Sequence, residues 1–128
     1  MKEPWKEKRI LVIDDEVDFL DTVKRGLTIA GYRNVAVLNQ PVRVKELLAE
    51  GCFDVALIDV CMPQMSGIEV LQYIRSVCPQ TRCLMITAIS DAETAKKCVS
   101  LGARDYLIKP VSRERLLSAL ERTLRSRV

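Results

Sequence analysis

The sequence contains no histidine among its 128 residues. Catalysis by a serine or cysteine nucleophile with a histidine base is therefore excluded, as are zinc sites built on imidazole ligands. The sequence also lacks any apolar run near the ~20 residues needed to span a bilayer, and its charged start is not followed by a signal-like apolar segment. We predict a cytoplasmic protein with no membrane partner, in which any histidine chemistry comes from another molecule.

The cysteines lack the patterns that indicate a disulfide framework or a metal site. Their number is odd, none has C-x-x-C spacing, and most lie within apolar segments. This distribution is typical of reduced thiols in a cytosol, and we expect no disulfide framework. The five are Cys52, Cys61, Cys78, Cys83 and Cys98.

The length and charge of the chain set broad limits on its organisation. A chain of 128 residues suits one domain with a proper core and leaves no room for a second. A net charge of +3 is too small to predict nucleic-acid binding by the chain itself. We expect residues 1–8 to form a frayed N-terminal tail in which Trp5 makes only incidental contacts, and residues 9–128 to form the domain.

Short apolar runs alternate with amphipathic segments along the chain. Each run is four to six residues long, and each following segment repeats apolar residues at helical spacing. Three of the predicted helices stop at a glycine, and spacings such as Ser66 to Glu69 and Ser90 to Glu93 predict capping boxes. Parallel strands need crossover helices, so the alternation predicts an α/β fold with a doubly wound, five-stranded parallel sheet flanked by five helices. The runs are 9–13, 34–38, 53–58, 83–86 and 104–108.

Reactive polar side chains stand at the ends of four of these five runs. In an open parallel sheet, ligands gather at the carboxyl ends of the strands, where these side chains would meet. Taken alone, Asp59 could equally mark a turn. The residues that would meet are Asp14 and Asp15, Asp59, Thr87 and Lys109.

Three carboxylates beside one lysine carry uncompensated negative charge, which a hard divalent cation would offset. Mg²⁺ suits oxygen ligands of this kind, and Mn²⁺ can replace it. With the cation in place, Asp59 can act as a nucleophile toward phosphorus. Lys109 would then neutralise one phosphoryl oxygen, and Thr87 would donate a hydrogen bond to another.

In order and in spacing, these motifs resemble the receiver domain of two-component response regulators over nearly the whole chain from residue 9. The resemblance implies a strand order of 2-1-3-4-5 and transfer of a phosphoryl group from a sensor histidine kinase or phosphotransfer protein to Asp59. It implies a signalling phosphoacceptor rather than an enzyme. The motifs are Asp14-Asp15, Asp59 followed by Met62-Pro63 and Ser66-Gly67, Thr87-Ala88, and Tyr106 ahead of Lys109-Pro110.

The resemblance also assigns individual roles. It implies metal ligation by Asp15, Asp59 and the backbone carbonyl of Cys61, with support from Asp14 through water. It implies that Thr87 and Tyr106 form a switch that reshapes the face built from the fourth helix, the fifth strand and the fifth helix. It further implies a cis peptide bond between Lys109 and Pro110.

Two positions depart from the commonest pattern of the family. Cys61 and Ile89 flank the place where water must enter to hydrolyse an acyl phosphate, so we expect them to tune the lifetime of the phosphorylated state; the alternative is that both simply fill space. The resemblance leaves open an output domain in the same chain or a target in another protein. Nucleic acid would be contacted only through such an output domain, and homodimerisation on activation is compatible with the switch face.

Three other functions compete with this interpretation. A Mg²⁺-dependent phosphatase or phosphotransferase with an aspartate nucleophile uses similar chemistry, but enzymes of the haloacid dehalogenase type carry D-x-D where this chain has Asp59-Val60-Cys61. A flavodoxin-like FMN protein would place phosphate beside Asp14, Asp15 and Glu16, where repulsion opposes it. An interaction module with a dead site would lack some of the site residues, all of which are present.

Overall fold

The computed structural model describes residues 3–125, so residues 1–2 and 126–128 of the predicted tail and domain lie outside the described residues. Five parallel strands form one sheet in the order β2-β1-β3-β4-β5, which confirms the predicted fold class and the order that the resemblance implied. The strands are β1 (Arg9–Ile13), β2 (Asn34–Leu38), β3 (Val55–Ile58), β4 (Arg82–Thr87) and β5 (Ala103–Ile108).

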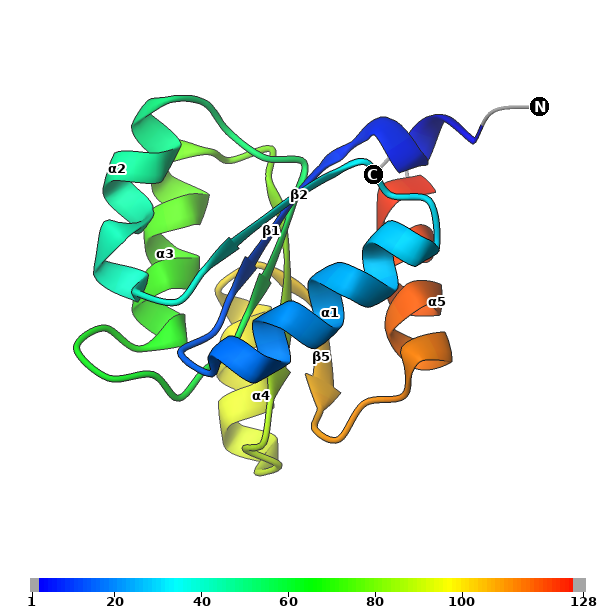
Figure 1. The fold of residues 1–128 in the computed structure, drawn as a ribbon. Helices are drawn as coiled ribbons and strands as arrows, with labels where there is room; N and C mark the ends of the chain where they lie inside the picture. The colour runs from blue at the N-terminus through cyan, green and yellow to red at the C-terminus, as the bar shows by residue number, and fades with distance from the viewer. Residues whose placement is uncertain (1–2, 126–128) are drawn as a thin grey trace.

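Helices cover both faces of the sheet (Figure 1). Helices α1 and α5 pack on one face, whereas α2, α3 and α4 pack on the other, and each face has its own hydrophobic cluster. Two short 3₁₀ helices precede β1 and α2. The helical elements are η1 (Pro4–Glu7), α1 (Val17–Ile29), η2 (Pro41–Arg43), α2 (Val44–Ala49), α3 (Gly67–Val77), α4 (Ala92–Ser100) and α5 (Arg113–Arg125).

The central strands read as continuous apolar runs because they are buried on both faces. In β3 the side chains of Val55 and Leu57 join the cluster beneath α1 and α5, while those of Ala56 and Ile58 join the opposite cluster. All four residues are buried. Burying such a run favours folding by about 25 cal/mol per Å² of apolar surface, so this strand fixes the position of the residue that follows it.

Side-chain caps mark the starts of α3 and α4. The capping box at α3 is present, because Ser66 Oγ accepts from the Glu69 amide and the Glu69 carboxylate accepts from the Ser66 amide. At α4 the predicted box is wrong: Asp91, not Ser90, is the N-cap residue. The Asp91 carboxylate accepts from both the amide and the hydroxyl of Thr94, at 2.8 and 2.6 Å, and a charged acceptor competes better for these donors than a hydroxyl.

The N-terminal segment is ordered in a way that the sequence did not indicate. Instead of fraying, Pro4–Glu7 forms a 3₁₀ helix, and Trp5 packs against the cluster beneath α1 and α5. The guanidinium of Arg125 lies 4.7 Å from the centroid of the Trp5 ring, and the Lys6 carbonyl accepts from the Arg33 amide. One tryptophan supplies enough apolar surface to hold a short charged segment against the domain.

The expectation about the cysteines is wrong at one pair. Cys52 and Cys78 form a disulfide, with 5.9 Å between their Cα atoms. Cys52 precedes β3 and Cys78 follows α3, so the parallel topology brings both to the amino-terminal edge of the sheet. Pairing across 26 residues leaves no local spacing motif, which is why the sequence did not show it. The remaining three, Cys61, Cys83 and Cys98, are free.

Reduction of this disulfide should lower the free energy of unfolding by about 3.5 kcal/mol, because the bridge closes a loop of 26 residues and removes its entropy from the unfolded chain. Guanidinium titrations with and without reductant measure the change. The Cys52→Ala/Cys78→Ala variant should already show the loss and should not respond to reductant, whereas Cys98→Ala reports the cost of removing a buried thiol alone. A wild-type midpoint that reductant does not move would contradict the prediction.

Candidate functional site at the carboxyl edge of the sheet

The parallel hydrogen-bond ladder continues past the strand ends and fixes the backbone of the predicted site residues. Each of three such residues donates its amide to a carbonyl of the neighbouring strand, so its side chain leaves the sheet from a rigid position. The bonds run from Asp14 to Leu38 at 3.1 Å, from Asp59 to Ile13 at 3.1 Å and from Lys109 to Thr87 at 2.8 Å.

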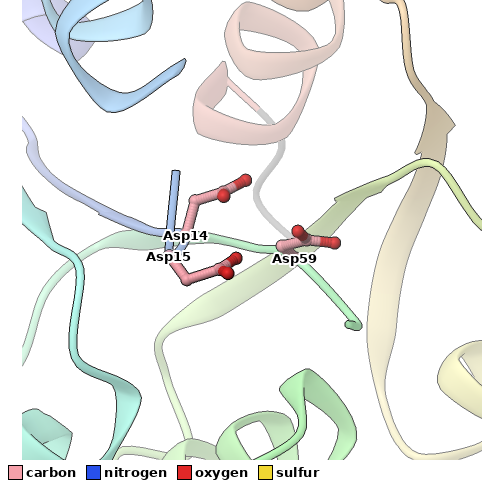
Figure 2. Close-up of side chains that lie close together, drawn as sticks. All are labelled: Asp14, Asp15 and Asp59. Atoms are coloured by element: carbon pink, nitrogen blue, oxygen red, sulfur yellow. The ribbon is translucent and has the colours of Figure 1, made fainter. Parts of the chain in front are cut away.

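Three carboxylates meet at this edge. Asp14 and Asp15 leave the end of β1 and point toward Asp59 at the end of β3, as Figure 2 shows. One oxygen from each residue lies within 4.8 Å of the others. Asp14 is 1% exposed and Asp59 6% exposed, whereas Asp15 faces solvent. Such a group of hard oxygen ligands, partly buried and open on one side, can hold a metal ion.

Lys109 supplies the positive charge nearest to these carboxylates. Its Nζ lies 2.8 Å from Asp14 Oδ2, 3.5 Å from Asp59 Oδ2 and 3.5 Å from the carboxylate of Glu16. The lysine side chain is only 15% exposed, so solvent screens these ion pairs weakly. Lys109 and Pro110 are joined by a cis peptide bond, as the resemblance implied.

Burial and charge shift the titration of this pair. Burial raises the pKa of Asp14 above its usual range, although its hydrogen bonds from Lys109 and from the Glu16 amide oppose the shift, and the charge of Asp59 adds to it. Burial alone would lower the pKa of Lys109, but the hydrogen bond and the charges of the surrounding carboxylates raise it above its usual value. The lysine therefore stays charged at neutral pH, and one ammonium does not offset all the carboxylates around it.

The two residues predicted to form a switch are linked through the backbone of Ile89. The Thr87 hydroxyl oxygen accepts from the Ile89 amide at 3.3 Å, and the Tyr106 hydroxyl donates to the Ile89 carbonyl at 2.7 Å. Thr87 is fully buried and Tyr106 half-buried. Burial raises the pKa of Tyr106, so its hydroxyl remains a donor at neutral pH. A movement of the Thr87 hydroxyl would therefore release one side of the loop that Tyr106 holds.

The two predicted tuning positions lie at the edge of this site. Cys61 is exposed, and its amide donates to Asp59 Oδ1 at 3.3 Å. Ile89 is half-buried and packs against the cluster on the α3 and α4 side of the sheet. The effect of these two side chains on hydrolysis of an acyl phosphate stays a prediction.

Gly67 and Phe19 contact the site, although the sequence did not predict a role for either residue. Gly67 begins α3, and its amide donates to the Val60 carbonyl at 2.8 Å. Phe19 lies in the first turn of α1, with its ring beside the Lys109 ammonium. Val17 stands at helical spacing from Leu20 and Val23, which predicts that it lies on the buried face of α1. In the structure Val17 is instead 52% exposed and Phe19 is half-buried. For Gly67 the sequence did contain a signal, because a glycine directly after the helix N-cap Ser66 indicates close approach of the helix start to another backbone.

Comparison with known proteins shows the family to which this chain belongs. A family profile described as the response regulator receiver domain matches residues 10–121. The chain belongs to this family. As a receiver domain it is a phosphoacceptor of two-component signalling rather than an enzyme, and its acidic group of Asp14, Asp15 and Asp59 is consistent with a site of aspartyl phosphorylation.

Individual relatives agree with this assignment. The receiver domain is 39% identical over 115 residues to the transcriptional regulatory protein ZraR of Escherichia coli K12, a match that covers 90% of this chain and 26% of that regulator. A receiver domain structure from Methanospirillum hungatei is similar with a TM-score of 0.87 and 30% identity over 92% of this chain and 94% of that chain. A response regulator structure from Burkholderia pseudomallei, with a phosphorylated aspartic acid and a calcium ion, is similar with a TM-score of 0.82 and 30% identity. The match covers 92% of this chain and 69% of that chain.

The receiver domain thus spans about a quarter of the length of that curated regulator. Among residues 3–125, no helix combines the length and the apolar character needed to cross a membrane.

Proposed function

We propose that Asp59 is the phosphoacceptor of this receiver domain and takes a phosphoryl group from a phosphohistidine of a sensor kinase or phosphotransfer protein. The observation that carries the proposal is the meeting of a buried Asp59 with two further carboxylates and the Lys109 ammonium at one edge of the sheet. The chain has no histidine, so the phosphohistidine must lie outside it.

The chain's own residues divide the reaction between them. An Asp59 carboxylate oxygen forms a bond to phosphorus while the bond from phosphorus to the partner's imidazole breaks, and the imidazole takes up a proton. Lys109 binds a phosphoryl oxygen, and the Thr87 hydroxyl donates to another. A bound Mg²⁺, or Mn²⁺ in its place, would be held by Asp14, Asp15, Asp59 and the Cys61 carbonyl and would offset the repulsion between carboxylate and phosphoryl group.

The output follows from the hydrogen bonds around Ile89. When Thr87 turns its hydroxyl toward the phosphoryl group, the Ile89 amide loses its acceptor while Tyr106 keeps the carbonyl. The loop between β4 and α4 then favours another arrangement, and the face formed by α4, β5 and α5 changes with it. Cys61 and Ile89 set how readily water hydrolyses the acyl phosphate and so how long this state lasts.

The partners beyond the kinase depend on the rest of the protein. ZraR is named as a transcriptional regulatory protein, and its match to this chain leaves about three quarters of it unaccounted for. We infer that the receiver domain acts on an output domain in the same protein or on a target in another one, and that nucleic acid is contacted only there. We also infer a cytoplasmic location and homodimerisation through the α4-β5-α5 face on activation. The domain is assigned to residues 9–128, with residues 1–8 as an N-terminal extension.

Incubation with acetyl phosphate and Mg²⁺ should add one phosphoryl group by intact mass, and a chelator should prevent the addition because uncompensated carboxylates repel the donor. Borohydride reduction of the acyl phosphate followed by peptide mapping should locate it at Asp59. No adduct, or an adduct mapped to another residue, would overturn the proposal. If the chelator leaves the rate of phosphorylation unchanged, the proposed requirement for a divalent cation is wrong.

A further inference from the structure

We propose that Phe19 is a positioning residue for Lys109, whose ammonium it holds over the acidic group through a cation–π contact. The inference rests on the proposed role of Asp59 and Lys109 in phosphoryl transfer. Lys109 Nζ lies 4.1 Å from the centroid of the Phe19 ring, inside the range of about 6 Å in which such contacts attract. Among residues 3–125, Phe19 and Phe53 are the only phenylalanines, and Phe53 lies at the opposite edge of the sheet.

The ammonium needs a restraint because its ionic partners compete for it. Asp14 is the nearest at 2.8 Å, while Asp59 and Glu16 both lie at 3.5 Å, on different elements. Four rotatable bonds connect that charge to the backbone, so a lysine without further contacts can shift among them. A shift toward the exposed Glu16 would take the charge away from the phosphoacceptor.

An aromatic ring restrains the charge without consuming it. An ammonium has three N–H donors. A further carboxylate in place of the ring would accept one of them and neutralise the charge. The face of the Phe19 ring attracts the ammonium electrostatically but accepts no conventional hydrogen bond, so donors remain for Asp14, for Asp59 and for an incoming phosphoryl oxygen.

Phe19 is itself held firmly enough for this task. It lies in the first turn of α1, directly after the loop that carries Asp14 and Asp15, and it packs half-buried against the cluster beneath α1 and α5. This loop and the first turn of α1 therefore place the carboxylates of Asp14 and Glu16 and the Phe19 ring around one ammonium. If the ring only filled space, an apolar side chain of the same shape would support phosphorylation equally well. A ring of the same shape with a weaker negative face therefore tests the cation–π contact.

The test uses site-specific incorporation of 3,4,5-trifluorophenylalanine at position 19, which keeps the shape of the ring but weakens its negative face. We expect the rate of phosphorylation by phosphoramidate in Mg²⁺ to fall about three- to tenfold, and Phe19→Leu to show a similar loss. The same fluorination at Phe53, whose ring contacts the Arg9 guanidinium at 4.4 Å, should leave the rate unchanged. In a Lys109→Ala background, fluorination at position 19 should have no effect on the rate.

A second readout avoids the reaction altogether. In metal-free buffer, fluorination at position 19 should lower the unfolding temperature when Lys109 is present and not in Lys109→Ala, which isolates the contact between the two side chains. A phosphorylation rate that is insensitive to fluorination in a protein that still modifies Asp59 would overturn this inference alone. A wild-type protein that accepts no phosphoryl group at Asp59 would overturn the proposed function instead.

Discussion

An Asp59→Asn variant should accept no phosphoryl group from phosphoramidate in the presence of Mg²⁺, because a neutral amide oxygen is not a nucleophile toward phosphorus. The same change should leave the domain folded and raise its free energy of unfolding by roughly 1 kcal/mol in metal-free buffer. Asp59 stands beside two carboxylates and one ammonium, so removing its charge relieves more repulsion than attraction. The amide oxygen can still accept from Cys61 as the carboxylate does. Intact mass and thermal unfolding measure both results.

Asp54→Asn is the matched control for this prediction. Asp54 lies just before β3, at the other edge of the sheet, and its carboxylate accepts from the Arg9 amide at 2.8 Å. Its replacement should leave phosphorylation unchanged and should not stabilise the domain, since no carboxylate cluster is relieved there. The assignment of Asp59 fails if Asp59→Asn is still phosphorylated. The electrostatic argument fails if Asp59→Asn unfolds more easily than the wild type without metal.

Mg²⁺ should distinguish the same two variants by stability. A ligand that binds only the folded state stabilises it by RT ln(1 + [L]/Kd), so the wild type should become more stable as Mg²⁺ is added. Asp59→Asn removes one of the three carboxylates that would hold the ion, so its response should be much weaker. Asp54→Asn should respond as the wild type does.

The fold could be predicted because its signals are local. Each strand is a short apolar run buried on both faces, and helices end at glycines such as Gly31, Gly51 and Gly102, all with positive φ. Because ligands gather at the carboxyl ends of parallel strands, residues far apart in the sequence could be predicted to lie close together in space. Asp14, Asp59 and Lys109 come together for this reason.

Features that depend on how distant elements meet could not be predicted. The Cys52–Cys78 disulfide joins two loops whose proximity exists only in the folded sheet. Whether Val17 or Phe19 faces inward depends on how α1 rotates against β1, and residue spacing alone placed Val17 on the wrong side. In both cases the missing information was the relative placement of two elements, not their existence.

Replacement of Gly67 by alanine should be the most destabilising single change near the site. A Cβ at this position would lie 1.9 Å from the backbone oxygen of Asp59 and 2.7 Å from the Cα of Val60. Both contacts are with backbone, so no side chain can rotate away, and α3 must move off the end of β3. We expect a loss of about 3 kcal/mol or more in the free energy of unfolding, at the upper end of the range for overpacking. Phosphorylation by phosphoramidate should also slow at temperatures where the variant is folded, because the backbone of the phosphoacceptor shifts.

Gly26→Ala provides the control, because a Cβ there would meet nothing within 4 Å in the middle of α1. The same methyl group should raise the free energy of unfolding by up to about 1 kcal/mol, through the higher helix propensity of alanine, and leave phosphorylation unchanged. Chemical denaturation of both variants separates close packing from propensity. If Gly67→Ala unfolds within 1 kcal/mol of the wild type, close contact between the start of α3 and the backbone of Asp59 does not constrain the phosphoacceptor. If Gly67→Ala lowers the free energy of unfolding and Gly26→Ala raises it, Gly67 is required because α3 approaches the strand end that carries Asp59 more closely than any side chain allows.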